Sequence, residues 1–318
     1  MAPAHASPGW DDSTTDDQPT DWGDRDRAAL IAMMRSTSKN TDWSRLAERV
    51  SDRGSAWRLW QDEHPGDLFG DSEAARVFEQ ALRDVESWKQ APFQMHTFMD
   101  RSYPERLRSV RQMPPVVFTR GVLVPREVGV CVVGSRNASD YALKFADDVS
   151  RELVTHGVTV ISGLARGIDT TAHRAALEAG GRTVAVLGNG LDHAYPRENR
   201  ELQERIAECG MLLTHFLPEY GPSRWSFPAR NVTMSAYGSA TVIVEAGEKS
   251  GTRIQAREAV AHGRPVILNS SVAQSISWGR AMSSEPGVHI AEAPADAIEH
   301  VDRILVQREA LTRILGTR

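Results

Sequence analysis

The chain has 318 residues, of which 41% are hydrophobic and 25% are charged, the composition of an ordinary globular protein with one large domain beside a small one. The net charge of −5 is uneven, because residues 1–24 hold six of the 42 acidic residues and none of the 37 basic ones. The rest carries a balance of +1, so overall charge neither demands nor forbids a nucleic-acid partner, and any positive surface has to be local. No run reaches the ~18 apolar residues of a membrane span, which excludes a membrane protein of that kind.

The first 24 residues are rich in Asp, Thr, Pro, Gly and Ser, and we predict that they form a disordered acidic tail. They do not combine a basic segment with an apolar one, so they are not a signal peptide, and we expect a cytoplasmic protein. From residue 25 to 92, apolar residues recur at spacings of three and four. This pattern predicts a small helical domain, and six of the eight tryptophans lie before position 100, which favours an aromatic core.

Short apolar runs alternate with helix-length segments in the remaining sequence. Such alternation predicts parallel strands with helices on both faces of the sheet. We therefore predict an α/β fold, a Rossmann-like doubly wound, mostly parallel sheet over residues 93–306. Residues 307–318 are expected to form the end of a helix or a tail, without a winged helix. The predicted strands are 128–133, 158–162, 183–187, 211–216, 240–245 and 265–268.

Glycine-bearing turns follow four of these runs, and three of the four carry a basic residue. In an open parallel sheet, ligands lie at the carboxyl ends of the strands, where glycine lets the backbone approach and free N–H groups favour an anion. Each loop alone is equally compatible with a glycine that only closes a tight turn. Together they predict a phosphate-binding edge. The turns contain Gly134, Ser135 and Arg136; Gly163 and Arg166; Gly188 and Gly190; and Lys249, Ser250 and Gly251.

The segment from Arg224 to Asn231 interleaves Trp225 and Phe227 with two arginines. We predict a loop before a helix, in which cations meet the backbone of a nucleic-acid single strand and Phe227 stacks on a base. The alternative is a buried loop that Phe227 anchors.

Catalytic patterns are scarce. There is no G-x-S-x-G, no H-E-x-x-H and no paired cysteine spacing, so we expect no catalytic residue, no metal and no cofactor. The first strand is not followed by G-x-G-x-x-G, and Gly247–Thr252 lacks the order of a P-loop. His173 follows Asp169 by four residues, a spacing that suits a hydrogen bond on one helix face.

These motifs, taken together, resemble those of the DprA/Smf family of DNA-processing proteins. The resemblance implies a non-enzymatic protein that binds single-stranded DNA, passes it to a RecA-type recombinase during natural transformation and forms a homodimer through the Rossmann-like domain. It also implies a DNA site containing Gly134, Ser135, Arg136, Phe227, Arg230 and Asn231. The matching segments are 103–107 (YPERL), 133–136 (VGSR), 162–169 (SGLARGID), 172–173 (AH), 185–188 (AVLG), 195–196 (YP), 198–200 (ENR), 227–228 (FP), 230–231 (RN), 244–246 (VEA) and 250–252 (SGT).

The sequence departs from the family pattern at Val232, where a second arginine is usual, and after Leu268, where a Pro-Gly turn is usual. A rival hypothesis therefore stays open: a nucleotide-binding sensor, or a nucleotide hydrolase that resembles the LOG-type phosphoribohydrolases. Against the hydrolase, the acid of the P-G-G-x-G-T-x-x-E motif is replaced by Gln255, and Glu258 lies one helical turn late.

Overall fold

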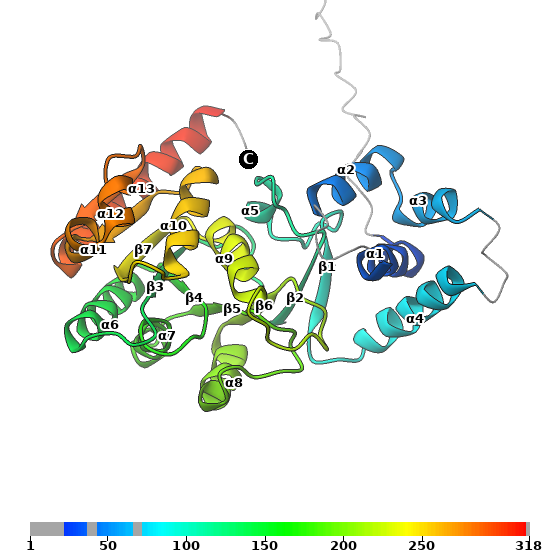
Figure 1. The fold of residues 1–318 in the computed structure, drawn as a ribbon, viewed down its shortest axis with the longest axis horizontal. Coiled ribbons are helices and arrows are strands. Elements are labelled where there is room, and N and C mark those ends of the chain that lie inside the picture. Colours follow the sequence, from blue (N-terminus) through cyan, green and yellow to red (C-terminus); the bar gives the residue numbers. More distant parts are fainter. Residues whose placement is uncertain (1–21, 37–42, 66–71, 316–318) are drawn as a thin grey trace, which may run out of the picture.

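The computed structural model describes residues 22–36, 43–65 and 72–315. A nine-stranded sheet forms the centre of the described chain, and four helices lie beyond one of its edges (Figure 1). The strand order across the sheet is β1 (Gln94–Thr97), β2 (Val116–Gly121), β6 (Met211–Thr214), β5 (Thr183–Val186), β4 (Thr159–Ser162), β3 (Gly129–Gly134), β7 (Ala240–Glu245), β8 (Val266–Asn269) and β9 (Val288–Ala291). Neighbouring strands from β6 to β9 pair in parallel, whereas β1 pairs with β2, and β2 with β6, in antiparallel orientation. The predicted α/β fold with a mostly parallel sheet is confirmed.

The strands are short and their middle members are buried along nearly their whole length, as parallel strands covered on both faces must be. The apolar runs of the sequence therefore predict them well. β1, β2 and β9 are not predicted, because β1 is mostly polar, β9 is interrupted by His289, and β2 follows two prolines that favour a linker.

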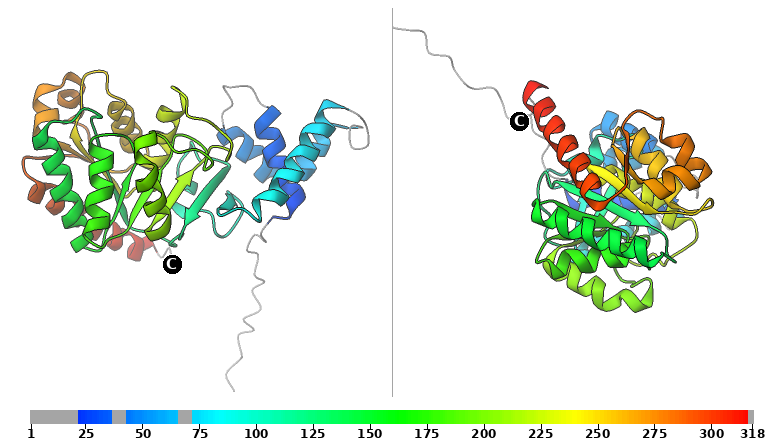
Figure 2. Two further views of the ribbon diagram at one scale, coloured as in Figure 1. Left: turned by 90° about the horizontal axis from the view of Figure 1, so that it is seen from below. Right: turned by 90° about the vertical axis from the view of Figure 1, so that its left-hand side faces the viewer.

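Alternating side chains of the strands divide the core between the two faces of the sheet. Val130 and Val132 of β3 pack with α6 (Asp140–Thr155), α7 (Ile168–Glu178) and α13 (Pro294–Leu315). Cys131 and Val133 belong to the opposite cluster, which includes α9 (Ser226–Tyr237) and α10 (Thr252–Ala261). Figure 2 shows helices on both faces of the sheet. The predicted boundary at residue 306 falls inside α13, which continues to Leu315 and projects from the body. No helix in the described ranges is long and apolar enough to cross a bilayer. The other helices are α5 (Glu105–Arg108), η2 (Arg197–Asn199), α8 (Arg200–Cys209), α11 (Ser270–Ser275) and α12 (Ser277–Met282).

The N-terminal helical region has an aromatic core. Its helices are α1 (Asp24–Ser36), α2 (Trp43–Arg53), α3 (Ala56–Glu63) and α4 (Glu73–Trp88). The rings of Trp57 and Phe78 lie 4.6 Å apart, and Trp60 is buried beside them. At the far end of α4, the edge of Trp88 meets the ring of Phe118 on β2, so this region and the sheet share one hydrophobic core.

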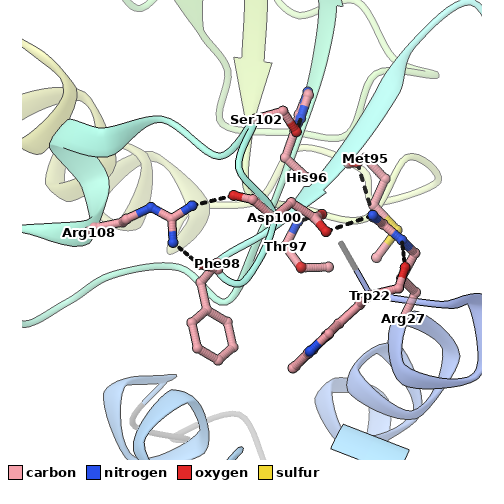
Figure 3. Close-up of polar contacts among 9 residues, drawn as sticks. All are labelled: Trp22, Arg27, Met95, His96, Thr97, Phe98, Asp100, Ser102 and Arg108. Atoms are coloured by element: carbon pink, nitrogen blue, oxygen red, sulfur yellow. Dashed lines mark hydrogen bonds and ion pairs between the residues drawn. The ribbon is translucent and has the colours of Figure 1, made fainter. Parts of the chain in front are cut away.

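A polar junction joins α1 to the turn after β1 (Figure 3). The carboxylate of Asp100 is 1% exposed; it accepts hydrogen bonds from the Arg27 guanidinium and from the Thr97 N–H, both at 2.7 Å. Arg27 also donates to the carbonyl of Trp22, whose ring lies edge-on to Phe98. The predicted disordered tail therefore extends too far, because Trp22 is packed and α1 begins at Asp24. Residues 1–21 lie outside the described residues.

Candidate nucleic-acid interface

A cavity of about 500 Å³ opens at the carboxyl ends of β3, β4 and β5. Four arginines reach it from different parts of the chain, which makes its wall cationic. The turns after three strands, the segment around η2 and the first turns of α9 all contribute. The lining residues are Arg136, Asn137, Gly163, Ala165, Arg166, Leu187, Gly188, Asn189, Tyr195, Pro196, Arg197, Glu198, Phe227 and Arg230.

Arg136 is exposed, and its guanidinium lies over the ring of Phe227, 5.1 Å from the centroid. The Tyr195 ring lies on the same wall, with its centroid 5.3 Å from that of Phe227 and the planes inclined by 35°. A cation and two aromatic rings thus form one surface in the cavity. Cation–π contact of this kind stabilises the orientation of an arginine without consuming its hydrogen-bond donors.

Arg230 is different, because it is 5% exposed and its donors serve the protein. Its Nη1 donates to the carbonyl oxygen of Gly163, just after β4, at 2.5 Å and to that of Val186, the last residue of β5, at 2.7 Å. Burial lowers the pKa of Arg230, and the nearby Asp169 carboxylate partly restores it. The guanidinium occupies the place where a side chain on residue 163 would lie, which explains the glycine there.

Asp169 is also part of the frame beneath the cavity. Its Oδ2 accepts hydrogen bonds from the backbone N–H groups of Gly163, at 3.1 Å, and Ala165, at 3.3 Å. Burial raises its pKa, and Arg230 opposes this rise. The predicted helix-face bond to His173 is wrong: His173 pairs instead with Thr183, 2.7 Å away, and burial lowers its pKa to about 3. Because His173 is buried, bonded to Thr183 and neutral at ordinary pH, its role is structural.

Arg166, by contrast, is exposed and forms an ion pair with Glu198 across the mouth of the cavity. This contact raises the pKa of Arg166 and lowers that of Glu198. The cavity therefore contains one carboxylate that competes with any anionic ligand for an arginine.

The predicted phosphate-binding turns do not all meet. Those containing Arg136, Gly163 and Arg166 line the cavity, as does Gly188, whereas Lys249, Ser250 and Gly251 are absent from its wall. β7 lies on the other side of β3 from β4 and β5, so its turn emerges beside the cavity.

Asn231 connects the two regions, because its Nδ2 donates to the carbonyl of Gly251 at 3.2 Å. Two other predicted residues lie where β3 ends: Gly134 is its last residue and Ser135 begins the turn. The Ser135 hydroxyl accepts from the Asn137 N–H at 3.1 Å, and a Cβ on Gly134 would lie 2.6 Å from Ile168. The glycine at position 134 is therefore explained by the close packing of α7 against β3, without a need for space for a ligand.

The predicted loop around Phe227 is wrong for most of its length. Helix α9 begins at Ser226, so Phe227, Arg230 and Asn231 lie on its first two turns, and Trp225 stands at its N-cap. Sequence reasoning also missed Tyr195, Arg197 and Glu198 as cavity residues. The sequence held one indication of this, because these three residues follow the glycine turn after β5 by ten residues or fewer.

Comparisons with known proteins agree with this architecture. A sequence model of DNA recombination-mediator protein A matches residues 94–308. DNA processing protein DprA of Bacillus subtilis (strain 168) is 32% identical over 198 residues, which are 62% of this chain and 67% of the relative. Protein Smf of Synechocystis is 39% identical over 188 residues, 58% of this chain and 47% of the relative. These matches thus span about half to two thirds of the relatives' lengths.

Two solved structures share the fold. The X-ray structure of DprA from Streptococcus pneumoniae superimposes with a TM-score of 0.70 at 28% identity, over 88% of this chain and 98% of that one. DprA from Helicobacter pylori gives a TM-score of 0.58 at 22% identity, over 68% and 97%. The family sequence model covers more than half of the chain and includes the whole cavity wall. The chain therefore belongs to the DNA recombination-mediator protein A family, known as DprA or Smf.

Proposed function

We propose that this protein binds single-stranded DNA in the arginine-lined cavity and acts as a recombination mediator without chemistry of its own. The observation that carries the proposal is the meeting of four arginines with an aromatic surface at the ends of β3, β4 and β5. Phosphates would pair with the exposed Arg136, Arg166 and Arg197, while buried Arg230 supplies a fixed positive charge beneath them. The Helicobacter pylori relative is described with a single-stranded DNA binding mode, which supports this choice of ligand.

A single strand fits this surface better than a duplex does. Its bases are free to turn toward Phe227 and Tyr195, whereas a duplex keeps its bases stacked inside and presents only phosphates. The turn at Lys249, Ser250 and Gly251, tied to the cavity through Asn231, would extend the path of the strand. Gly134 and Ser135, which precede Arg136, would let the phosphate backbone of the DNA strand approach the Arg136 side chain closely.

Further parts of the proposal rest on family membership. They are transfer of the strand to a RecA-type recombinase, assembly as a homodimer, a cytoplasmic location and the absence of catalysis. The frame of Asp169 and His173 supports the last point, since both are buried in internal contacts rather than open to the cavity.

The test compares an oligothymidylate, a duplex of equal length and a mononucleotide. We expect affinity for the single strand to exceed affinity for the duplex, with a log–log salt slope of about −2 to −3, since each neutralised phosphate contributes roughly −0.7. Arg136→Ala should weaken binding about ten- to a hundredfold and flatten the slope by about 0.7. Arg174→Ala, an exposed arginine on α7 outside the cavity, is the matched control.

Equal affinity for the duplex, or affinity independent of salt, would contradict the proposal. Tight binding of the mononucleotide with none of the single strand would favour the rival, a nucleotide sensor.

A further inference from the structure

Phe227 offers little free surface to a base. One side of its ring is occupied by the Arg136 guanidinium, and Tyr195 lies beside it. The backbone of Gly188 approaches so closely that a Cβ there would lie 2.7 Å from Phe227 Cδ1. The ring is thus enclosed by a cation, an aromatic ring and a strand end, and it is only partly exposed.

Tyr195 has the opposite character. It is 40% exposed, and within the described chain the single ring that contacts its own ring is Phe227. Its hydroxyl forms no hydrogen bond with any described residue. The side chain is therefore held by ring packing and not by a hydrogen bond. An aromatic side chain supported on one side and open on the other is the form that base stacking requires.

Trp225 is the other exposed aromatic of this region, at 55%. Its ring packs edge-on against Phe216 and Tyr220, and it does not line the cavity. Tyr195, in contrast, shares the cavity wall with all four arginines. A nucleotide whose base lay on Tyr195 would have its phosphates within the cationic part of the same cavity.

We propose that Tyr195 is the base-stacking platform of the site and that Phe227 is a positioning residue that packs against it and holds it in place. The inference rests on the proposed function, single-strand binding, and replaces Phe227 as the stacking residue in it. In this arrangement the base contacts Tyr195, the Tyr195 ring packs against Phe227, and the Arg136 guanidinium lies over the Phe227 ring. The arrangement is tolerant of base identity, because every base has a face to offer.

The experiment measures how tightly the parent and its variants bind two strands, one with bases and one without. The probes are an oligothymidylate of about 15 nucleotides and an abasic strand with the same number of phosphates. Tyr195→Leu should weaken binding of the oligothymidylate about five- to a hundredfold and leave binding of the abasic strand unchanged. Tyr195→Phe should restore most of the affinity, because the ring is kept. The salt slope should not change, since no cation is lost.

Tyr141→Leu is the matched control, because Tyr141 is 58% exposed on α6 and is not part of the cavity wall. Circular dichroism and thermal unfolding establish that each variant is folded. If Tyr195→Leu binds the oligothymidylate like the parent, or weakens both strands equally, the stacking role is wrong.

If Phe227→Leu alone removes the preference for the base-bearing strand, Phe227 is the platform and the inference is overturned. If the parent binds neither strand, the proposed function fails and the inference fails with it. A parent that binds and responds to Arg136→Ala, with Tyr195→Leu silent, overturns the inference alone.

Discussion

Replacing Arg230 by methionine tests whether the cavity rests on a buried charge. The substitution keeps much of the apolar stem but removes the donors to Gly163 and Val186 and the charge beside Asp169. Asp169 is 5% exposed and would remain in the interior without its cationic neighbour. Leaving a buried charge without compensation and buried carbonyl groups without a donor costs about 3–5 kcal/mol, and we expect a loss of that size in the free energy of unfolding.

Urea titrations followed by circular dichroism give this free energy. Arg224→Met is the control, since Arg224 is exposed just before α9, and it should change stability by less than about 0.5 kcal/mol. Combining Arg230→Met with Asp169→Asn removes both charges, so the double variant should be more stable than the sum of the single losses by about 1–3 kcal/mol. Additive losses, or a cost for Arg230→Met no larger than the control, would refute the reasoning.

Three further changes follow from the contacts described. Glu198→Gln should free Arg166 and tighten single-strand binding about two- to fivefold, as measured by fluorescence anisotropy beside Glu201→Gln as control; equal effects of the two would contradict it. Asp100→Asn should lower the free energy of unfolding by about 2–3 kcal/mol, because Arg27 loses its partner at the junction; unchanged urea denaturation would contradict it. Burial lowers the pKa of His96 from 6.5 to about 4, so protons favour the unfolded chain and its contribution is lost as pH falls through this range. As the pH falls from 6.5 to 4, the difference in free energy of unfolding between the parent and His96→Gln should therefore narrow by about 1.4 kcal/mol per pH unit. A difference that stays constant over this range would contradict the prediction.

The sequence predicts the centre of the sheet because each parallel strand there is an unbroken apolar run, as in Val130 to Val133. It does not predict β1, since three of the four residues of Gln94–Thr97 are polar and the segment is a strand only through its pairing with β2. Local pattern cannot supply such a partner.

The site likewise contains residues that local sequence predicts and residues that only the whole fold places. Arg136 follows a strand end and lines the cavity. Lys249 also follows a strand end, but the order of strands, which is a property of the whole chain, places it elsewhere. The burial of Arg230 depends on the carbonyl groups of Gly163 and Val186, at the ends of β4 and β5, which are 67 and 44 residues away in sequence.

The antiparallel pair β1–β2 has a practical consequence for shortened versions of the protein. A fragment that began at β1 would lose α1 and α4, and with them the cover over Phe118 and the partner of Asp100. It would carry an uncovered aromatic patch next to an unpaired carboxylate at the outer edge of its sheet, where strands of other molecules can add. Such a fragment should associate with itself or precipitate, and poor recovery of it would reflect this lost cover rather than a defect in the Rossmann-like core.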